Sequence, residues 1–275
     1  MKQETRAYVN FLEGISSDIE ELRALSTTMK RKVETNASKE DLAVLEQKAL
    51  GDMIQHAQGD FSSALHSKQR ALDIVFKLFG EEHPGTADSY HTLGDSQHAQ
   101  RDFCSALQSK QRALDIRIKV FEEEHSCTAV GYHTLGDTQH ALGDLPSALQ
   151  SKQRALDIRL KLFGEEHSST AVSYHTLGDT QHALGDLPSA LQCKQRALDI
   201  RLKLFGEEHS STAVSYHKLG DTQHALGDLP SALQSKQRAL DIRLKLFGEE
   251  HSSIADSYHT LGDTQQAQGD FSSAL

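Results

Sequence analysis

The segment GDLPSALQSKQRALDIRLKLFGEEHSSTAVSYHTLGDTQHAL begins at Gly143 and recurs almost letter for letter beginning at Gly185. The copies differ at two of 42 positions, where Ser151 and Thr176 are replaced by Cys193 and Lys218. A fixed period is typical of a solenoid, in which each unit buries its apolar face against its neighbours. The repeat therefore predicts one elongated array in place of two ordinary domains.

Each unit is predicted to begin with a helix of moderate length. In the unit around Tyr174, Ser168 or Ser169 can cap this first helix. The apolar residues spaced for one face of it are Ala171, Tyr174, Leu177 and Ala183. Gly185 suits the position just past its end.

A second helix is predicted to follow in each unit. Asp186 is a good N-cap for it, and Pro188 falls in the first turn, where the missing N–H costs nothing. Gly206 can end the helix, which should then be about 28 Å long. Its apolar residues are Ala190, Leu191, Ala197, Leu198, Leu202 and Phe205. One copy has Glu122 in place of the terminal Gly, so we expect that helix end to fray or extend.

A tyrosine recurs every 42 residues and marks the register of the units, as Tyr90, Tyr132, Tyr174, Tyr216 and Tyr258. A degenerate copy precedes Tyr90. Residues 46–275 are therefore predicted to form about five full units and a truncated sixth, and residues 1–45 a separate N-terminal helical segment.

The residues that recur in each unit resemble those of the tetratricopeptide repeat. These are an aromatic residue, a Leu-Gly pair and two small residues, here Tyr174, Leu177, Gly178, Ala190 and Ala197. The second helix ALDIRLKLFGEEH and its loop resemble the repeats of kinesin light chain and nephrocystin-3-like proteins. The resemblance covers roughly residues 46–275. It implies an all-α fold, a right-handed α-solenoid of helix-turn-helix pairs.

Histidine and aspartate recur on the predicted first helices as His-x3-Asp-x2-His. Residues at i, i+4 and i+7 lie on one helix face, and the family resemblance implies that this face lines a concave groove that binds a partner. The candidate groove residues are His91, Asp95, His98, His133, Asp137, His140, His175, Asp179, His182, His217, Asp221 and His224.

Two other interpretations of these histidines stay open. Imidazole and carboxylate are plausible Zn²⁺ ligands, although we favour a polar groove with no metal and no cofactor. All 16 histidines titrating near pH 6.5 would change the formal charge from -10 to about +6. Binding of an acidic peptide would then strengthen as the pH falls, unless the histidines are neutral hydrogen-bonding groups.

Two further patterns are expected to be structural. His167 follows two glutamates in the loop and is expected to pack on the turn and hydrogen-bond a helix end. Lys152, Arg154, Arg159 and Lys161 form a basic stripe on the second helix. The acidic loops and the net charge argue against nucleic acid there, so we expect a solvated outer face.

The first 45 residues contain a short heptad pattern from Leu12 to Val33, interrupted at Ser26. It spans about three heptads, close to the lower limit for a coiled coil. One interpretation is a helix that caps the first repeat, and the other is a coiled coil that forms a dimer through residues 12–33.

Composition excludes several classes of function. The chain has no apolar run of about 18 residues, no signal-like N-terminus, and three scattered cysteines, which together predict a cytoplasmic protein that does not enter membranes. The net charge of -10 disfavours nucleic acid and anionic lipid.

The sequence predicts a binding protein with no enzymatic activity. It contains no Gly-rich phosphate loop, no Gly-x-Ser-x-Gly and no HExxH motif. We expect a protein-protein interaction scaffold that binds a peptide or helical segment of a partner in its groove. The alternative is a fragment of a larger signalling or adaptor receptor, or of a kinesin light chain-like cargo adaptor, whose effector domain lies elsewhere.

Overall fold

The computed structural model of the chain describes residues 61–269, where ten α-helices alternate between two types and no strand occurs. The first helices of the units are α4 (Pro84–Ala99), α6 (Ser126–Ala141), α8 (Ser168–Ala183), α10 (Ser210–Ala225) and α12 (Ser252–Gln268). The second helices are α3 (Phe61–Phe79), α5 (Phe103–Phe121), α7 (Leu145–Phe163), α9 (Leu187–Phe205) and α11 (Leu229–Phe247). The predictions for residues 1–45, including the seam at 12–33, and the boundary at residue 46 lie outside the described residues.

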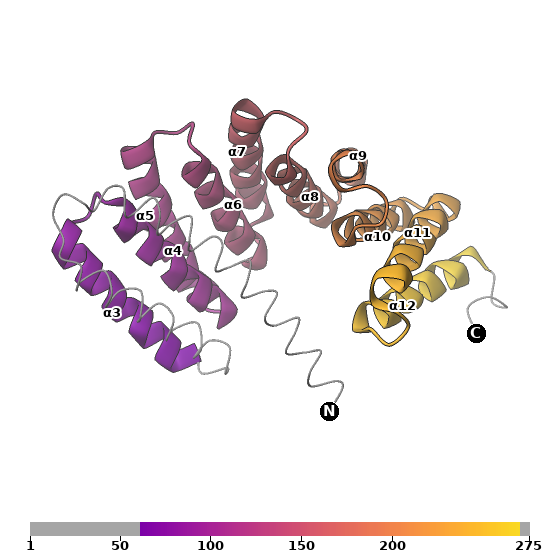
Figure 1. Ribbon diagram of the computed structural model, residues 1–275, viewed down its shortest axis with the longest axis horizontal. Coiled ribbons are helices and arrows are strands. Elements are labelled where there is room, and N and C mark those ends of the chain that lie inside the picture. The colour runs from indigo at the N-terminus through magenta and orange to yellow at the C-terminus, as the bar shows by residue number, and fades with distance from the viewer. Residues whose placement is uncertain (1–60, 270–275) are drawn as a thin grey trace. The chain divides into compact units, whose positions relative to one another are not determined.

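The helices follow one another in chain order (Figure 1), and extensive contacts join helices that are consecutive in the sequence. Helices α4, α6, α8 and α10 therefore pack on the second helix of their own unit and on that of the preceding unit, and α12 packs on α11. This arrangement is an α-solenoid of helix pairs, which confirms the predicted fold class. Between residues 61 and 269, none of the helices has the length and apolar character needed to cross a membrane.

The second helices begin and end where the sequence predicts. Asp186 is the N-cap of α9, and its carboxylate accepts a hydrogen bond of 3.2 Å from the backbone N–H of Ser189. Asp102, Asp144 and Asp228 do the same in their units. Gly206 is the C-cap of α9 with a φ of +79°. Gly185, just past the first helix α8, has a φ of +82°, the left-handed conformation that favours glycine beyond a helix end.

The first helices are capped by histidine, so the prediction of a serine cap is wrong. Ser168 is already the first residue of α8, and His167 is its N-cap. Nδ1 of His167 accepts a hydrogen bond of 3.2 Å from the backbone N–H of Ser169. The ring stacks on Phe163 with the centroids 4.5 Å apart. This confirms that the loop histidine packs on the turn and hydrogen-bonds a helix end, and the same cap recurs at His83, His125, His209 and His251.

The helix that lacks a terminal glycine ends at the same position as the others. Helix α5 ends at Phe121, and Glu122 takes a φ of +68° and a ψ of 175° as its C-cap. Gly164 takes a φ of +77° at the corresponding position. The predicted fraying or extension is therefore wrong, because the loop that follows imposes its geometry on the glutamate, in a region of φ and ψ suited to glycine.

The core consists of small and aliphatic residues between successive helices. Ala171, Ala190 and Ala197 have no exposed surface, and Leu177 is 2% exposed. A Cβ on Gly178 would lie 3.3 Å from the carbonyl oxygen of Ala190, so glycine permits the close approach of the two helices. Two residues predicted for this face lie outside it: Ala183 and Phe205 are exposed, because each lies at the end of its helix, beyond the packed region.

Candidate partner-binding face

Within residues 61–269, each first helix has one face that no neighbouring helix covers. On α8 this face contains Val172, which is 38% exposed, and Asp179, whose side chain is 37% exposed, with Thr176 between them and Ala183 beyond. The spacing from Val172 to Asp179 is two helical turns. The same face recurs in the neighbouring units, and we call it the open face: residues 88, 92, 95 and 99 of α4, and their equivalents at intervals of 42 on α6, α8 and α10.

The predicted groove residues divide into exposed aspartates and largely buried histidines. The side chains of Asp95, Asp137, Asp179 and Asp221 are 46%, 39%, 37% and 31% exposed. His91, His133, His175 and His217 are 18%, 16%, 14% and 14% exposed, and each lies 3.3–3.7 Å from the aspartate four residues later. The remaining histidines of the set, His98, His140, His182 and His224, are partly buried. The structure therefore places all twelve residues on or beside one face, with the carboxylates as its charged surface.

A buried lysine from the second helix holds each of these aspartates. Lys152 is 4% exposed, and its Nζ lies 2.9 Å from Oδ1 of Asp137. The same ammonium donates to the carbonyl oxygen of Thr176 in the next unit at 3.4 Å. Lys110, Lys194 and Lys236 pair in the same way with Asp95, Asp179 and Asp221. Each lysine thus fixes the position of one carboxylate on the open face.

The expectation of a solvated basic stripe on the second helices is wrong for half of its residues. Arg154 and Lys161 are exposed, but Lys152 and Arg159 are buried. Nη1 of Arg159 donates to Oγ of Ser173 at 2.7 Å, which joins α7 to α8. Lysine and arginine tolerate this burial because each charged group meets a carboxylate, hydroxyl or carbonyl partner.

Six of the histidines beside the open face are neutral at physiological pH. Burial lowers the pKa of His91, His133 and His175 to about 4, although the neighbouring aspartates act in the opposite direction. Burial also lowers the pKa of His98, His140 and His217. The hypothesis that all 16 histidines titrate together near pH 6.5 is therefore wrong. The neutral state agrees with the alternative, but its hydrogen bonds are not seen, because each of these six rings has a buried nitrogen with no hydrogen-bond partner in the described part of the chain.

Asp95 and Asp179 carry charge at neutral pH. Burial would raise the pKa of Asp179, but Lys194 and His175 outweigh it and hold that pKa below its ordinary value. The pKa of Asp95 is lowered in the same way, against burial, by His91 and Lys110. No group of three or more His, Cys, Asp or Glu residues that could hold a metal ion occurs within residues 61–269. The ammonium groups of the buried lysines already occupy the position beside these carboxylates that a bound cation would take.

The junction between α5 and α6 differs from the three junctions that follow it. Gly131 replaces the serine that accepts a hydrogen bond from the buried arginine elsewhere, and Asp88 replaces the exposed valine. Nη2 of Arg117 instead donates to Oδ1 of Asp88 at 3.0 Å. Its Nε and Nη1 are buried with no hydrogen-bond partner in the described part of the chain. The substitution at Asp88 thus compensates in part for the loss of the serine hydroxyl.

The last full unit of the array also departs from the pattern. Lys218 replaces the threonine of the open face, is 44% exposed, and lies 3.5 Å from Oδ2 of Asp221. Lys194 donates at 2.7 Å to the carbonyl of His175, in its own unit, whereas Lys152 reaches the next unit. Burial lowers the pKa of Lys194, and the like charge of Lys218 adds to the effect.

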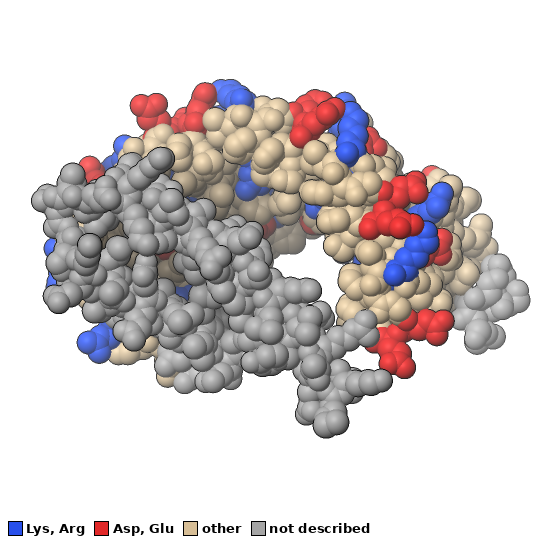
Figure 2. All heavy atoms as spheres, in the orientation of Figure 1, with Lys and Arg blue, Asp and Glu red and all other residues tan. Residues whose placement is uncertain are grey.

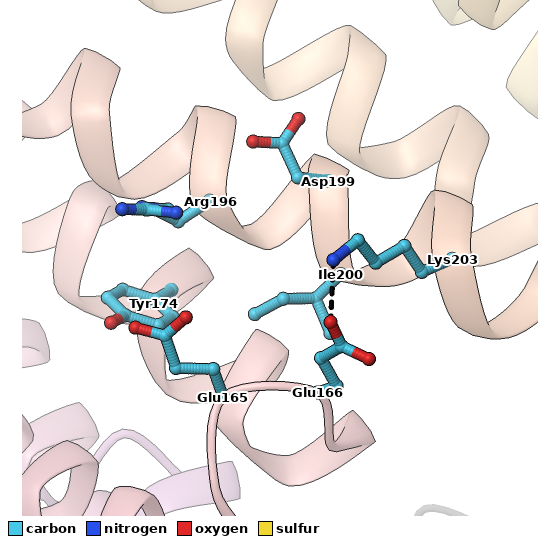
Figure 3. Close-up of a pocket in the computed structure, with 7 residues that line it drawn as sticks. All are labelled: Glu165, Glu166, Tyr174, Arg196, Asp199, Ile200 and Lys203. Carbon is cyan, nitrogen blue, oxygen red and sulfur yellow. Dashed lines mark hydrogen bonds and ion pairs between the residues drawn. The ribbon is translucent and has the colours of Figure 1, made fainter.

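A second recurring surface lies at the loops between units. Figure 3 shows a cavity of about 40 Å³ lined by Glu165, Glu166, Tyr174, Arg196, Asp199, Ile200 and Lys203, with the ring of Tyr174 beneath the guanidinium of Arg196. Nζ of Lys203 lies 2.6 Å from Oε1 of Glu166. Figure 2 shows acidic and basic side chains next to one another along the upper edge of the view. The cavity has room for little more than water, and two of its charged residues, Lys203 and Glu166, pair with each other.

Sequence reasoning missed the valines of the open face and the buried cations behind it. The valines were detectable as a recurring apolar residue seven positions before Asp137, Asp179 and Asp221. The burial of the lysines was not detectable, because the residues that surround them lie on other helices.

The described helix pairs define the chain as a helical repeat protein. The tetratricopeptide repeat family matches residues 42–119, 105–161, 132–203, 188–245 and 211–275. The chain therefore belongs to the tetratricopeptide repeat family, and its repeats are kinesin light chain-like. No curated protein matches it.

Three solved structures are similar to this chain. BtubC (BKLC) from P. vanneervenii has a TM-score of 0.68 and 21% identity, over 78% of this chain and 86% of that one. A Podosopora anserina protein, described as a "putative kinesin light chain" with nearly identical TPR-like repeats, has a TM-score of 0.63 and 26% identity, over 70% and 91%. The apo form of RapI has a TM-score of 0.68 and 17% identity, over 94% and 69%. The first and third show the fold alone. Tetratricopeptide repeat proteins are generally non-catalytic interaction scaffolds.

Proposed function

We propose that this chain is a non-catalytic, cytoplasmic scaffold that binds a peptide or helical segment of a partner protein on its open face. The observation that carries the proposal is the recurrence of this face, with its exposed Val and Asp, in successive first helices. A surface repeated at a fixed interval suits an elongated segment that crosses several helices. The proposal includes a possible dimer through residues 12–33, and it includes no nucleic acid, membrane, metal or cofactor.

The similarity to a kinesin light chain with nearly identical repeats favours a second candidate, a cargo adaptor whose effector domain lies elsewhere. Both candidate functions place the partner on the open face, so one binding experiment tests this surface for both. Alanine at His175 and Asp179 would be a poor probe. Lys194 is 2% exposed, and loss of its carboxylate partner would leave a buried charge without that partner and destabilise the fold.

The three exposed valines, Val130, Val172 and Val214, make a better probe, because their side chains contact solvent and form no hydrogen bonds or ion pairs. We would select peptides from a random displayed library on the purified chain, then measure their binding to a triple variant, Val130→Gln, Val172→Gln and Val214→Gln. Glutamine keeps the helix propensity and adds no charge. The matched control is Gln150→Ala, Gln192→Ala and Gln234→Ala, which alters exposed residues of the second helices.

The selected peptides should lose affinity for the valine variant and keep it for the glutamine control, with the helical circular dichroism of both unchanged. Peptides that bind both variants equally well would place the binding surface elsewhere. A library that yields no binder would count against a peptide scaffold.

A further inference from the structure

Basic residues are concentrated on the second helices, whereas the charged residues of the first helices are nearly all aspartates. The second helices also carry aspartates, such as Asp157 and Asp199. The five described first helices carry seven aspartates and one lysine, with no arginine and no glutamate: Asp88, Asp95, Asp137, Asp179, Asp221, Asp256, Asp263 and Lys218. The described second helices carry the other lysines and nearly all the arginines. The net charge of the chain does not reveal this uneven distribution of basic residues. Because the first helices carry almost no basic residue, the open face has one sign of charge over most of its length.

The cations that pair with these aspartates do not reach the surface. Lys110, Lys152 and Lys236 are 4–5% exposed, and the aspartates that they hold are 31–46% exposed. Each pair therefore points its carboxylate outward and its ammonium inward. An approaching ligand meets the negative end of the pair, already fixed in position by the lysine, so that little entropy is lost when the carboxylate is engaged.

Apolar surface lies beside these carboxylates. Val130, Val172 and Val214 are 38–39% exposed, two turns before the aspartate of the same helix. The neighbouring histidine rings are neutral, since burial lowers their pKa, and add no positive charge. The open face thus offers valines on one side and carboxylates on the other, unit after unit.

We propose that the segment bound on the open face is basic and amphipathic, with apolar side chains against the valines and lysine or arginine side chains against the aspartates. This inference rests on the proposed function and specifies the chemistry of the partner. Charge complementarity and the adjacent apolar surface carry it, and an acidic or uncharged segment would leave the fixed carboxylates without new partners.

The chain itself contains a substitution that alters this chemistry. Lys218 takes the place of Thr92, Thr134 and Thr176 of the other units, and lies 3.5 Å from Oδ2 of Asp221. It places one exposed positive charge on an otherwise acidic face. A unit with lysine at this position evidently folds, so that the same exchange can be made in the neighbouring units without loss of structure.

The experiment measures binding of a synthetic helix, two copies of Leu-Lys-Lys-Leu-Leu-Lys-Leu, to the full chain by fluorescence anisotropy. Variants with Thr134→Lys and Thr176→Lys should bind it about threefold more weakly for each lysine added, and Lys218→Thr about threefold more tightly, the size expected of exposed ion pairs. The matched control, Gln150→Lys with Gln192→Lys, adds the same charge to second helices and should change the affinity much less. Binding should weaken as salt is added.

Three results would overturn the inference: equal binding of the corresponding Leu-Glu helix, an equal loss of affinity in the control pair, or no effect of the threonine substitutions. The proposed function fails separately. Peptides selected from the random library that depend on the three valines but carry no excess of lysine or arginine would preserve the scaffold and refute the basic partner.

Discussion

Buried neutral histidine should make the stability of this array fall as the pH drops below 6.5. Burial lowers the pKa of His133 to about 4, against an ordinary value of 6.5. Between these values the unfolded chain binds a proton that the folded chain does not, so the histidine costs stability as the pH falls. The cost is absent above 6.5, grows as the pH falls towards 4, and then levels off. Between pH 7 and pH 5 it amounts to about 2 kcal/mol for one such histidine.

The perturbation that isolates this effect is His133→Gln, since glutamine keeps a polar side chain near Asp137 but does not titrate. Urea unfolding followed by circular dichroism at pH 7 and pH 5 gives the free energy of unfolding at each pH. The wild-type chain should lose about 2 kcal/mol more than the variant over this interval.

His259→Gln is the matched control for this measurement. His259 forms the same kind of contact, 3.1 Å to Asp263, but its side chain is 77% exposed, so that the substitution replaces a ring that lies largely in water. This control should follow the wild-type pH dependence. Parallel curves for the wild type and His133→Gln would refute the assignment of a buried, neutral ring, as would an equal effect of the control.

Three further substitutions test features of the helix ends and of the contacts between units. Glu122→Gly should raise the free energy of unfolding by about 1 kcal/mol, because glycine adopts the backbone conformation at this C-cap with less strain; an unchanged urea midpoint would mean that the glutamate is not strained. Gly131→Ser should stabilise the chain by about 1 kcal/mol, because the serine hydroxyl supplies a hydrogen-bond acceptor to Arg117. This requires a small shift of the Leu114 side chain, which would lie 3.0 Å from the new Cβ. The gain should be larger when Asp88→Val is also present, and a double-mutant cycle without coupling would contradict this. Asp186→Ala should cost about 1 kcal/mol through loss of the N-cap of α9, whereas Gln192→Ala, on the exposed side of the same helix, should be nearly neutral.

Local features of the fold could be predicted from the sequence because single residues determine them. Asp186 and Gly185 fix a helix start and a helix end by their own side-chain and backbone chemistry. The serine cap of α8 was predicted wrongly because the choice between Ser168 and His167 depends on Phe163, whose ring holds the imidazole in place. At Glu122 the following loop determined the backbone conformation, and the conformational preference of glutamate did not.

The candidate face could be predicted less fully, for a related reason. Helical spacing places His175 and Asp179 on one side of α8, and the structure agrees. Their different exposure depends on the adjacent helices, because Lys194 comes from α9. A lysine in a polar stretch is expected at the surface, so its burial against an aspartate on another helix was invisible in the local pattern.

The contacts between units also determine how such an array can change its length. They span fixed offsets of 24 residues from Lys152, 14 from Arg159 and 37 from Lys203, all shorter than one unit. Unequal crossing-over that inserts or removes a whole unit therefore rebuilds every one of these contacts at the new junction. Asp88 and Gly131 are the exception, since they compensate for each other across two units. A recombination event that separates Asp88 from Gly131 leaves the buried Arg117 poorly paired. Insertion or loss of a unit should therefore be better tolerated among the later units than at the junction between α5 and α6.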